Sequence, residues 1–101
     1  MAITSTLSPD GSTLTIHIEG RFDFSSHQDF RAAYEPLTRA PDSYIVDMRE
    51  TSYLDSSALG MLLLLRDHAG GDQSDIAIRN CTPDVRKILT ISNFGQLFDI
   101  Q

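Results

Sequence analysis

The chain has 101 residues, of which 41% are hydrophobic and 22% are charged. That length and composition predict one globular domain spanning residues 1–101 and argue against intrinsic disorder. Eight lysines and arginines against fourteen aspartates and glutamates give a net charge of −6. Such a chain has no basic field to attract nucleic acid or an anionic membrane surface, so both are excluded as expected partners.

The N-terminal residues and the cysteine content indicate a cytoplasmic protein. Residues 1–5 lack the positively charged start and the apolar segment of a secretory signal peptide. Cys81 is the only cysteine and has no partner for an internal disulfide. The longest apolar run, residues 59–65, is far shorter than the about 20 residues that cross a bilayer. We therefore expect a soluble protein in a reducing compartment.

The first half of the chain predicts two strands, a helix and a third strand. Alternating apolar and polar residues predict a β-hairpin over residues 3–7 and 13–19, with a turn around residues 9–11. A helix is expected over residues 26–38, with Ser25 as its N-cap and Gln28 three residues later. The β-branched, mostly apolar run at residues 44–48 predicts a central strand.

The second half of the chain alternates helices and strands. The leucine-rich residues 59–65 predict a helix that ends near Gly70 and Gly71, and residues 76–78 predict a strand parallel to the central one. Pro83 marks the start of another helix, Asn93 suits a left-handed C-cap, and residues 97–100 are expected to close the sheet. The resulting order, β-β-α-β-α-β-α-β, is an α/β fold with three helices and a mixed, mostly parallel sheet.

A polar cluster, residues 52–60, lies between the central strand and the leucine-rich helix. Backbone N–H groups in the first turn of a helix lack partners and favour an anion. A phosphate on Ser56 would find donors there, and its charge would disrupt a contact surface. The simpler interpretation is that Asp55 or Ser56 caps the helix, and the two roles are compatible.

Residues 55–60, Asp-Ser-Ser-Ala-Leu-Gly, are the point at which the sequence becomes recognisable. They resemble the motif of the STAS family, specifically of small bacterial anti-sigma factor antagonists. The resemblance covers nearly the whole chain. Residues 20–23, Gly-Arg-Phe-Asp, are similar to the family's Gly-x-aliphatic-Asp turn, the predicted element order agrees, and apolar residues fall where the family's last helix and strand expect them: Val85, Leu89, Phe98 and Ile100. The chain departs from the family's usual residues at Phe22 and at Asn93-Phe94.

The resemblance implies a role for each residue of the motif. Ser56 would be the phosphoacceptor, with Ser57 as the second choice, and Asp55 would orient the loop. Ser57 would also support the helix start. Asp23 would help to shape the site, although an aspartate in a turn also commonly binds local N–H groups.

The function that the resemblance implies is protein binding, not catalysis. The chain would bind an anti-sigma factor while Ser56 is unphosphorylated, so freeing a sigma factor for transcription, and would release it on phosphorylation. A serine kinase, which could be the anti-sigma factor itself, and a PP2C-type phosphatase would set the balance between the two forms.

The leucine-rich helix is expected to leave apolar surface for a partner. Its leucines spread around most of the helix circumference instead of forming one stripe. The alternative is that the preceding loop and the helix over residues 26–38 bury the extra leucines. The residues expected to contact the partner are Tyr53, Leu54, Ser56, Gly60 and Leu63.

Other chemistry has little support in the sequence. His17, His27 and His68 have no further ligand at metal-binding spacing, and no glycine-rich phosphate loop is present, so no cofactor or metal is expected. Cys81 has no basic neighbour that would activate it. A hydrolase would need a G-x-S-x-G elbow, which is missing. A structural STAS subunit of a signalling or lipid-transport assembly, with the serine as an ordinary cap, stays open as an alternative.

Overall fold

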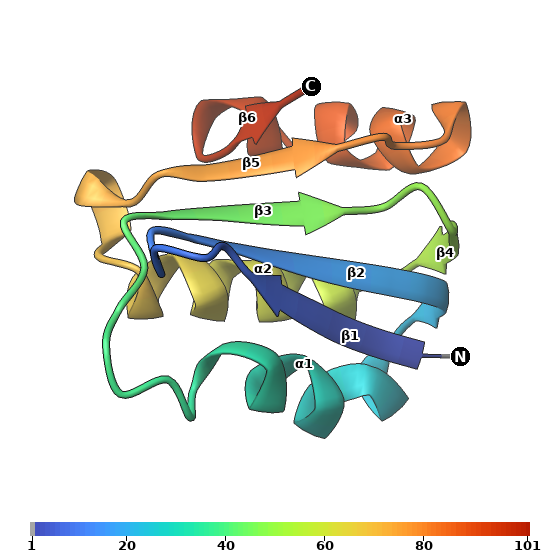
Figure 1. The fold of residues 1–101 in the computed structure, drawn as a ribbon. Helices are drawn as coiled ribbons and strands as arrows, with labels where there is room; N and C mark the ends of the chain where they lie inside the picture. Colours follow the sequence, from blue (N-terminus) through green and yellow to red (C-terminus); the bar gives the residue numbers. More distant parts are fainter. Residues whose placement is uncertain (1) are drawn as a thin grey trace.

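The computed structural model describes residues 2–101 and arranges them as a mixed sheet with helices packed on it (Figure 1). The main path of the sheet has the order β1-β2-β3-β5-β6. Within residues 2–101, only the β1–β2 pair is antiparallel and the other strand pairs are parallel, which confirms the predicted fold class. The strands are β1 (Ala2–Leu7), β2 (Thr13–Phe22), β3 (Ser43–Asp47), β4 (Thr51–Leu54), β5 (Ile76–Arg79) and β6 (Asp99–Ile100).

Three helices cover the apolar face of this sheet: α1 (His27–Tyr34), α2 (Ser56–His68) and α3 (Pro83–Ile91). In β2, Leu14, Ile16 and Ile18 are buried, whereas the residues between them are partly exposed. The buried side chains of the sheet and of all three helices form one cluster. Strand alternation therefore defines a core face, and the helices pack on it. No helix within residues 2–101 is long and apolar enough to cross a membrane.

The helix expected over residues 26–38 is shorter and is capped by a different residue. A 3-10 turn (Phe24–Ser26) precedes α1, which ends at Tyr34, two residues before Pro36. Asp23 is the N-cap of that turn, and its carboxylate accepts a hydrogen bond from the N–H of Ser25 at 3.1 Å. The N-cap of α1 itself is Ser26, not the predicted Ser25, and its side chain makes no capping hydrogen bond. The predicted start at about residue 26 is within one residue of the observed one. The predicted end at residue 38 was wrong, because Pro36 has no N–H to continue the helical hydrogen bonds.

The short strand β4 was not predicted, and it makes the order β-β-α-β-β-α-β-α-β. It runs parallel to the end of β2, beyond an irregularity at Gly20 and Arg21. The Thr51 hydroxyl anchors it by donating to the carbonyl of Ile18 at 2.8 Å. Its sequence, Thr-Ser-Tyr-Leu, lacks the apolar run of a central strand, because its two middle residues are exposed and one of its two buried residues, Thr51, is polar.

The C-terminal strand is also shorter than expected. Residues 97–100 were predicted as a strand, but β6 contains only Asp99 and Ile100, because a 3-10 turn (Phe94–Gln96) takes up the preceding chain. Asn93, before that turn, has φ 60°, so its predicted left-handed conformation is confirmed.

Candidate functional site

Two loops meet where β2 and β4 end side by side. The parallel register pairs Arg21 with Tyr53 and Phe22 with Leu54. The residues that follow these two strands, Asp23 and Asp55, therefore lie at the same edge of the sheet. Their proximity has an electrostatic consequence, because the charge of Asp23 acts to raise the pKa of Asp55. The structure thus brings Asp23 to the loop that carries Ser56.

Asp55 is the cap of α2. Its carboxylate accepts hydrogen bonds from the hydroxyl of Ser57 at 2.6 Å and from the N–H of Ala58 at 3.1 Å. These bonds, the one from Ser57 first, hold the pKa of Asp55 below its ordinary value despite the nearby charge of Asp23. Of the two capping residues that the sequence allowed, the structure assigns the role to Asp55.

The two adjacent serines differ in what their hydroxyls do. Ser56 is the first residue of α2 and is exposed, and its hydroxyl makes no hydrogen bond to any of residues 2–101. Ser57 is only partly exposed, and its hydroxyl is committed to Asp55. A modifying enzyme would therefore meet a free hydroxyl at Ser56 and an engaged one at Ser57.

One face of α2 extends from Ser56 into solvent. Ser56, Gly60 and Leu63 are spaced by four and three residues, so they lie on the same side of the helix. We call these three residues the α2 stripe. Leu63 is 39% exposed, and Leu64 beside the stripe is 49% exposed. The helix therefore leaves some apolar surface for a partner, as one prediction held. It also buries other apolar residues, as the alternative held: Met61, Leu62 and Leu65.

Tyr53 and Leu54, the other two residues expected to contact a partner, differ in their exposure. Tyr53 is 39% exposed, and the guanidinium carbon of Arg21 lies 4.1 Å from the centre of its ring. Leu54 is 2% exposed and belongs to the core, which corrects the expectation that its side chain contacts a partner. In a four-residue strand with only its two ends buried, the period-2 alternation that would have revealed this is too short to read.

Phe24 is an exposed aromatic residue that the sequence analysis did not single out. It is 75% exposed and follows Asp23 just as Ser56 follows Asp55, so it lies at the same edge of the sheet. Its ring stacks against that of His27 with 6.1 Å between the centres. An aromatic residue after a strand normally predicts burial, and only its place between two polar turn residues, Asp23 and Ser25, hints at exposure.

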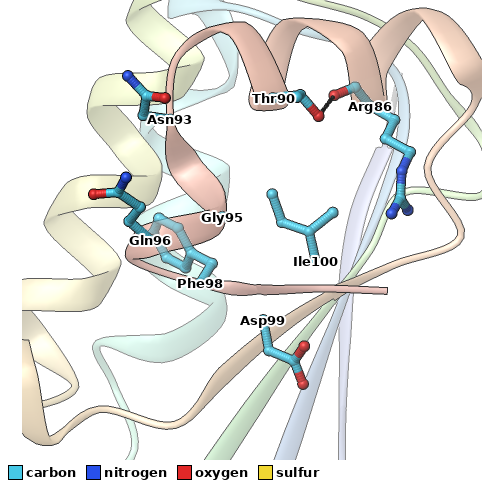
Figure 2. Close-up of a pocket in the computed structure, with 8 residues that line it drawn as sticks. All are labelled: Arg86, Thr90, Asn93, Gly95, Gln96, Phe98, Asp99 and Ile100. Carbon is cyan, nitrogen blue, oxygen red and sulfur yellow. Dashed lines mark hydrogen bonds between the residues drawn. The ribbon is translucent and has the colours of Figure 1, made fainter.

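A hollow of about 470 Å³ lies beside the site and is lined by Phe24, Ser25, His27, Gln28 and Asp29. No group of three histidine, cysteine, aspartate or glutamate side chains within residues 2–101 is placed to hold a metal ion. A hollow of about 370 Å³ lies between α3 and β6 and contains none of the predicted site residues (Figure 2). Its lining residues are Arg86, Thr90, Asn93, Gly95, Gln96, Phe98, Asp99 and Ile100.

Comparisons with known proteins agree with this geometry. The family model described as "Mlab, STAS domain" matches residues 5–99. The chain is 65% identical, over 99% of both lengths, to a STAS-domain containing protein of Pseudomonas aeruginosa.

Solved structures show the same fold at low identity. The chain is similar to the anti-sigma factor antagonist SpoIIAA in its unphosphorylated form, with a TM-score of 0.75 and 20% identity over 99% of this chain and 87% of that one. It is also similar to the Bacillus cell fate determinant SpoIIAA in its phosphorylated form, with a TM-score of 0.66 and 23% identity over 99% and 91% of the two chains.

Proposed function

The chain belongs to the STAS family, and from that premise we propose that it is an anti-sigma factor antagonist controlled by phosphorylation of Ser56. In this proposal the unphosphorylated form binds an anti-sigma factor through the α2 stripe and Tyr53, and so frees a sigma factor for transcription. Phosphorylation releases the partner. The protein acts in the cytoplasm as a substrate of enzymes and is not itself an enzyme.

The free hydroxyl of Ser56 is the observation that carries the proposal. Asp55 already caps α2, so the fold has no evident need of a serine at position 56. The hydroxyl is exposed at the start of a helix, where a kinase can reach it and where backbone N–H groups favour a phosphate. The bond from Ser57 to Asp55 makes Ser57 the weaker acceptor.

The place of the phosphate explains how it would release a partner. Leu63 is seven residues from Ser56, about 10 Å along the helix, so both fall within one protein interface. A phosphoserine adds about −1.5 to −2 charge, next to the carboxylates of Asp55 and Asp23. A partner that covers the α2 stripe would also have to bury the phosphate, which carries a desolvation penalty. An acidic group of the partner would in addition be repelled by it. No refolding of the domain is required.

The enzymes of the switch would be a serine kinase and a PP2C-type phosphatase. The kinase could be the anti-sigma factor itself, because a partner docked on the α2 stripe already lies beside the Ser56 hydroxyl. SpoIIAA has solved structures in an unphosphorylated and a phosphorylated form, and its likeness to the fold described here supports the proposal that this fold can carry a phosphate.

A direct test is intact-mass analysis of the protein purified from its native cells, followed by fragmentation to locate any added phosphate. We expect one phosphate on Ser56. A phosphate found only on Ser57 would move the switch to that residue, and the lack of phosphate under every growth condition would count against the proposal.

A binding test uses three variants and affinity capture from the same cells, with mass spectrometry of the captured proteins. Ser56→Ala should retain an anti-sigma factor under all conditions, and Ser56→Asp should lose it. Ser57→Ala is the matched control and should behave as the native protein does. If Ser56→Ala and Ser56→Asp capture the same partners equally, the serine is an ordinary surface residue and a structural role gains support.

A further inference from the structure

The two edges of the sheet differ in their capacity to accept another strand. β6 closes one edge with only two residues, one of them Asp99. β1 forms the other edge with six residues, and it contains no charged residue and no proline (Figure 1). Its register with β2 has no bulge. Natural proteins usually protect an open edge with short strands, lysine, proline or bulges, and β1 has none of these devices.

The free edge carries an exposed apolar side chain at one end and a hollow at the other. The register places Ile3, Ser5 and Leu7 opposite core residues of β2, so these three side chains lie on the helix-covered face. Leu7 is nevertheless 43% exposed. Near the start of β1, a hollow of about 210 Å³ is lined by Ile3, Ser5, Asp29, Ala32 and Ala33.

One antiparallel pairing of two copies joins these features. In an antiparallel pair, the side chains of directly opposed residues point to the same face of the sheet. The helices of two copies therefore lie on the same face of a joined sheet only if one residue of β1 pairs with the same residue of the other copy at the two-fold axis. A pairing centred on Ser5 places Leu7 of each copy opposite Ile3 of the other, at the hollow. A pairing centred on Thr4 would carry Leu7 beyond Ile3. The Ser5-centred arrangement has the two-fold symmetry of an isologous dimer.

We propose that β1 is a self-association edge, at which a second copy of the chain adds its β1 antiparallel, centred on Ser5, to form one sheet across two molecules. The two copies repel each other at long range, because each carries a net charge of −6. The paired strands contribute no charge to that repulsion. Added salt screens charges beyond about 8 to 10 Å, so it should strengthen the association.

The turn that follows β1 keeps Leu7 in place for this contact. The N–H of Ser8 donates to the carbonyl of Thr13 at 2.9 Å, and the N–H of Gly11 donates to the carbonyl of Ser8 at 2.9 Å. The carboxylate of Asp10 accepts from the hydroxyl of Ser8 at 2.8 Å. These hydrogen bonds fix the end of β1. The backbone of Leu7 is therefore already ordered before the two copies associate.

The first experiment is sedimentation velocity of the native protein over a range of concentrations at low and moderate salt. We expect a mass that rises from 11.2 kDa toward twice that value with concentration, and more readily at moderate salt. Leu7→Ala should weaken the association at least tenfold. Leu64→Ala is the matched control, because it removes a leucine of similar exposure on α2. A protein that stays monomeric throughout, or equal weakening by both variants, would overturn the proposal.

The second experiment tests the register by cross-linking in a Cys81→Ser background. Ser5→Cys should form a dimer with a short bis-maleimide, because the two thiols meet at the two-fold axis. Thr15→Cys, on the inner strand β2, is the control and should give little dimer. Equal cross-linking of the two variants would contradict the Ser5-centred pairing. Neither experiment involves Ser56, so this proposal can fail while the phosphorylation switch stands.

Discussion

Asp23 and Asp55 end adjacent parallel strands in the same way: each caps the helical segment that follows and accepts a 2.6 Å hydrogen bond from the serine two residues later. The bonds from Ser25 and Ser57 are the largest causes that hold the pKa of each aspartate below its ordinary value. The residue between aspartate and serine is thereby presented to solvent in both loops. In one loop that residue is Phe24, and in the other it is Ser56.

Removal of the α2 cap separates the roles of two neighbouring residues. Asp55→Ala deprives the N–H of Ala58 of its partner, and we expect the thermal midpoint to fall by about 5 °C. Ser56→Ala removes a hydroxyl that holds no part of the helix and should change the midpoint by less than about 2 °C. Differential scanning calorimetry compares the two. A larger loss for Ser56→Ala would make Ser56 the structural cap.

Two adjacent leucines of α2 that differ in burial should respond differently to truncation. Leu62 is fully buried, so Leu62→Ala should reduce the free energy of unfolding by about 2 to 5 kcal/mol. Leu63→Ala should have a much smaller effect, about 0.5 kcal/mol, because that side chain lies at the surface and is already 39% exposed. Urea unfolding followed by circular dichroism measures both. Leu63→Ala should nevertheless lower partner capture, and retention of full capture would remove Leu63 from the proposed interface.

Gly60 is a glycine that the fold itself does not require. A Cβ at this position would meet nothing within 4 Å, and glycine inside a helix is less stable than alanine. Gly60→Ala should therefore raise the free energy of unfolding by about 0.5 to 1 kcal/mol. If a partner approaches the α2 stripe closely, the same variant should bind it less tightly. Gly11→Ala, at φ +77°, is the control and should destabilise the protein.

Asp10 should make the turn after β1 sensitive to acid. Hydrogen bonds from the side chain and N–H of Ser12 and from Ser8 lower the pKa of Asp10 from 3.8 to about 2. A lowered folded-state pKa contributes stability above the unfolded-state value, and that contribution is lost as the pH falls from about 4 to about 2. NMR titration of the Asp10 carboxyl measures the midpoint directly. Ser12→Ala should move it upward, and a native midpoint near 4 would refute the prediction.

Local sequence signals were sufficient for most elements and for the motif. Apolar alternation predicted the hairpin, and leucine spacing predicted α2, because each pattern reflects a period that the backbone itself imposes. The position of Ser56 at a helix start followed from its neighbours in the chain. The N-cap of α1 and the strand β4 did not follow, because several residues near Asp23 can serve as caps and a four-residue strand has too few positions to show a pattern.

The amino-acid sequence by itself determined the α/β class, the family and the serine pair, since these depend on local periodicity and on a contiguous motif. Only the tertiary structure decided which serine hydroxyl is free, that Asp23 lies beside Asp55, that Leu54 is buried and that Phe24 is exposed. The proximity of Asp23 to Asp55 and the burial of Leu54 depend on contact between β2 and β4, which lie about thirty residues apart. Such contacts arise from strand pairing and helix packing, which no single stretch of sequence encodes.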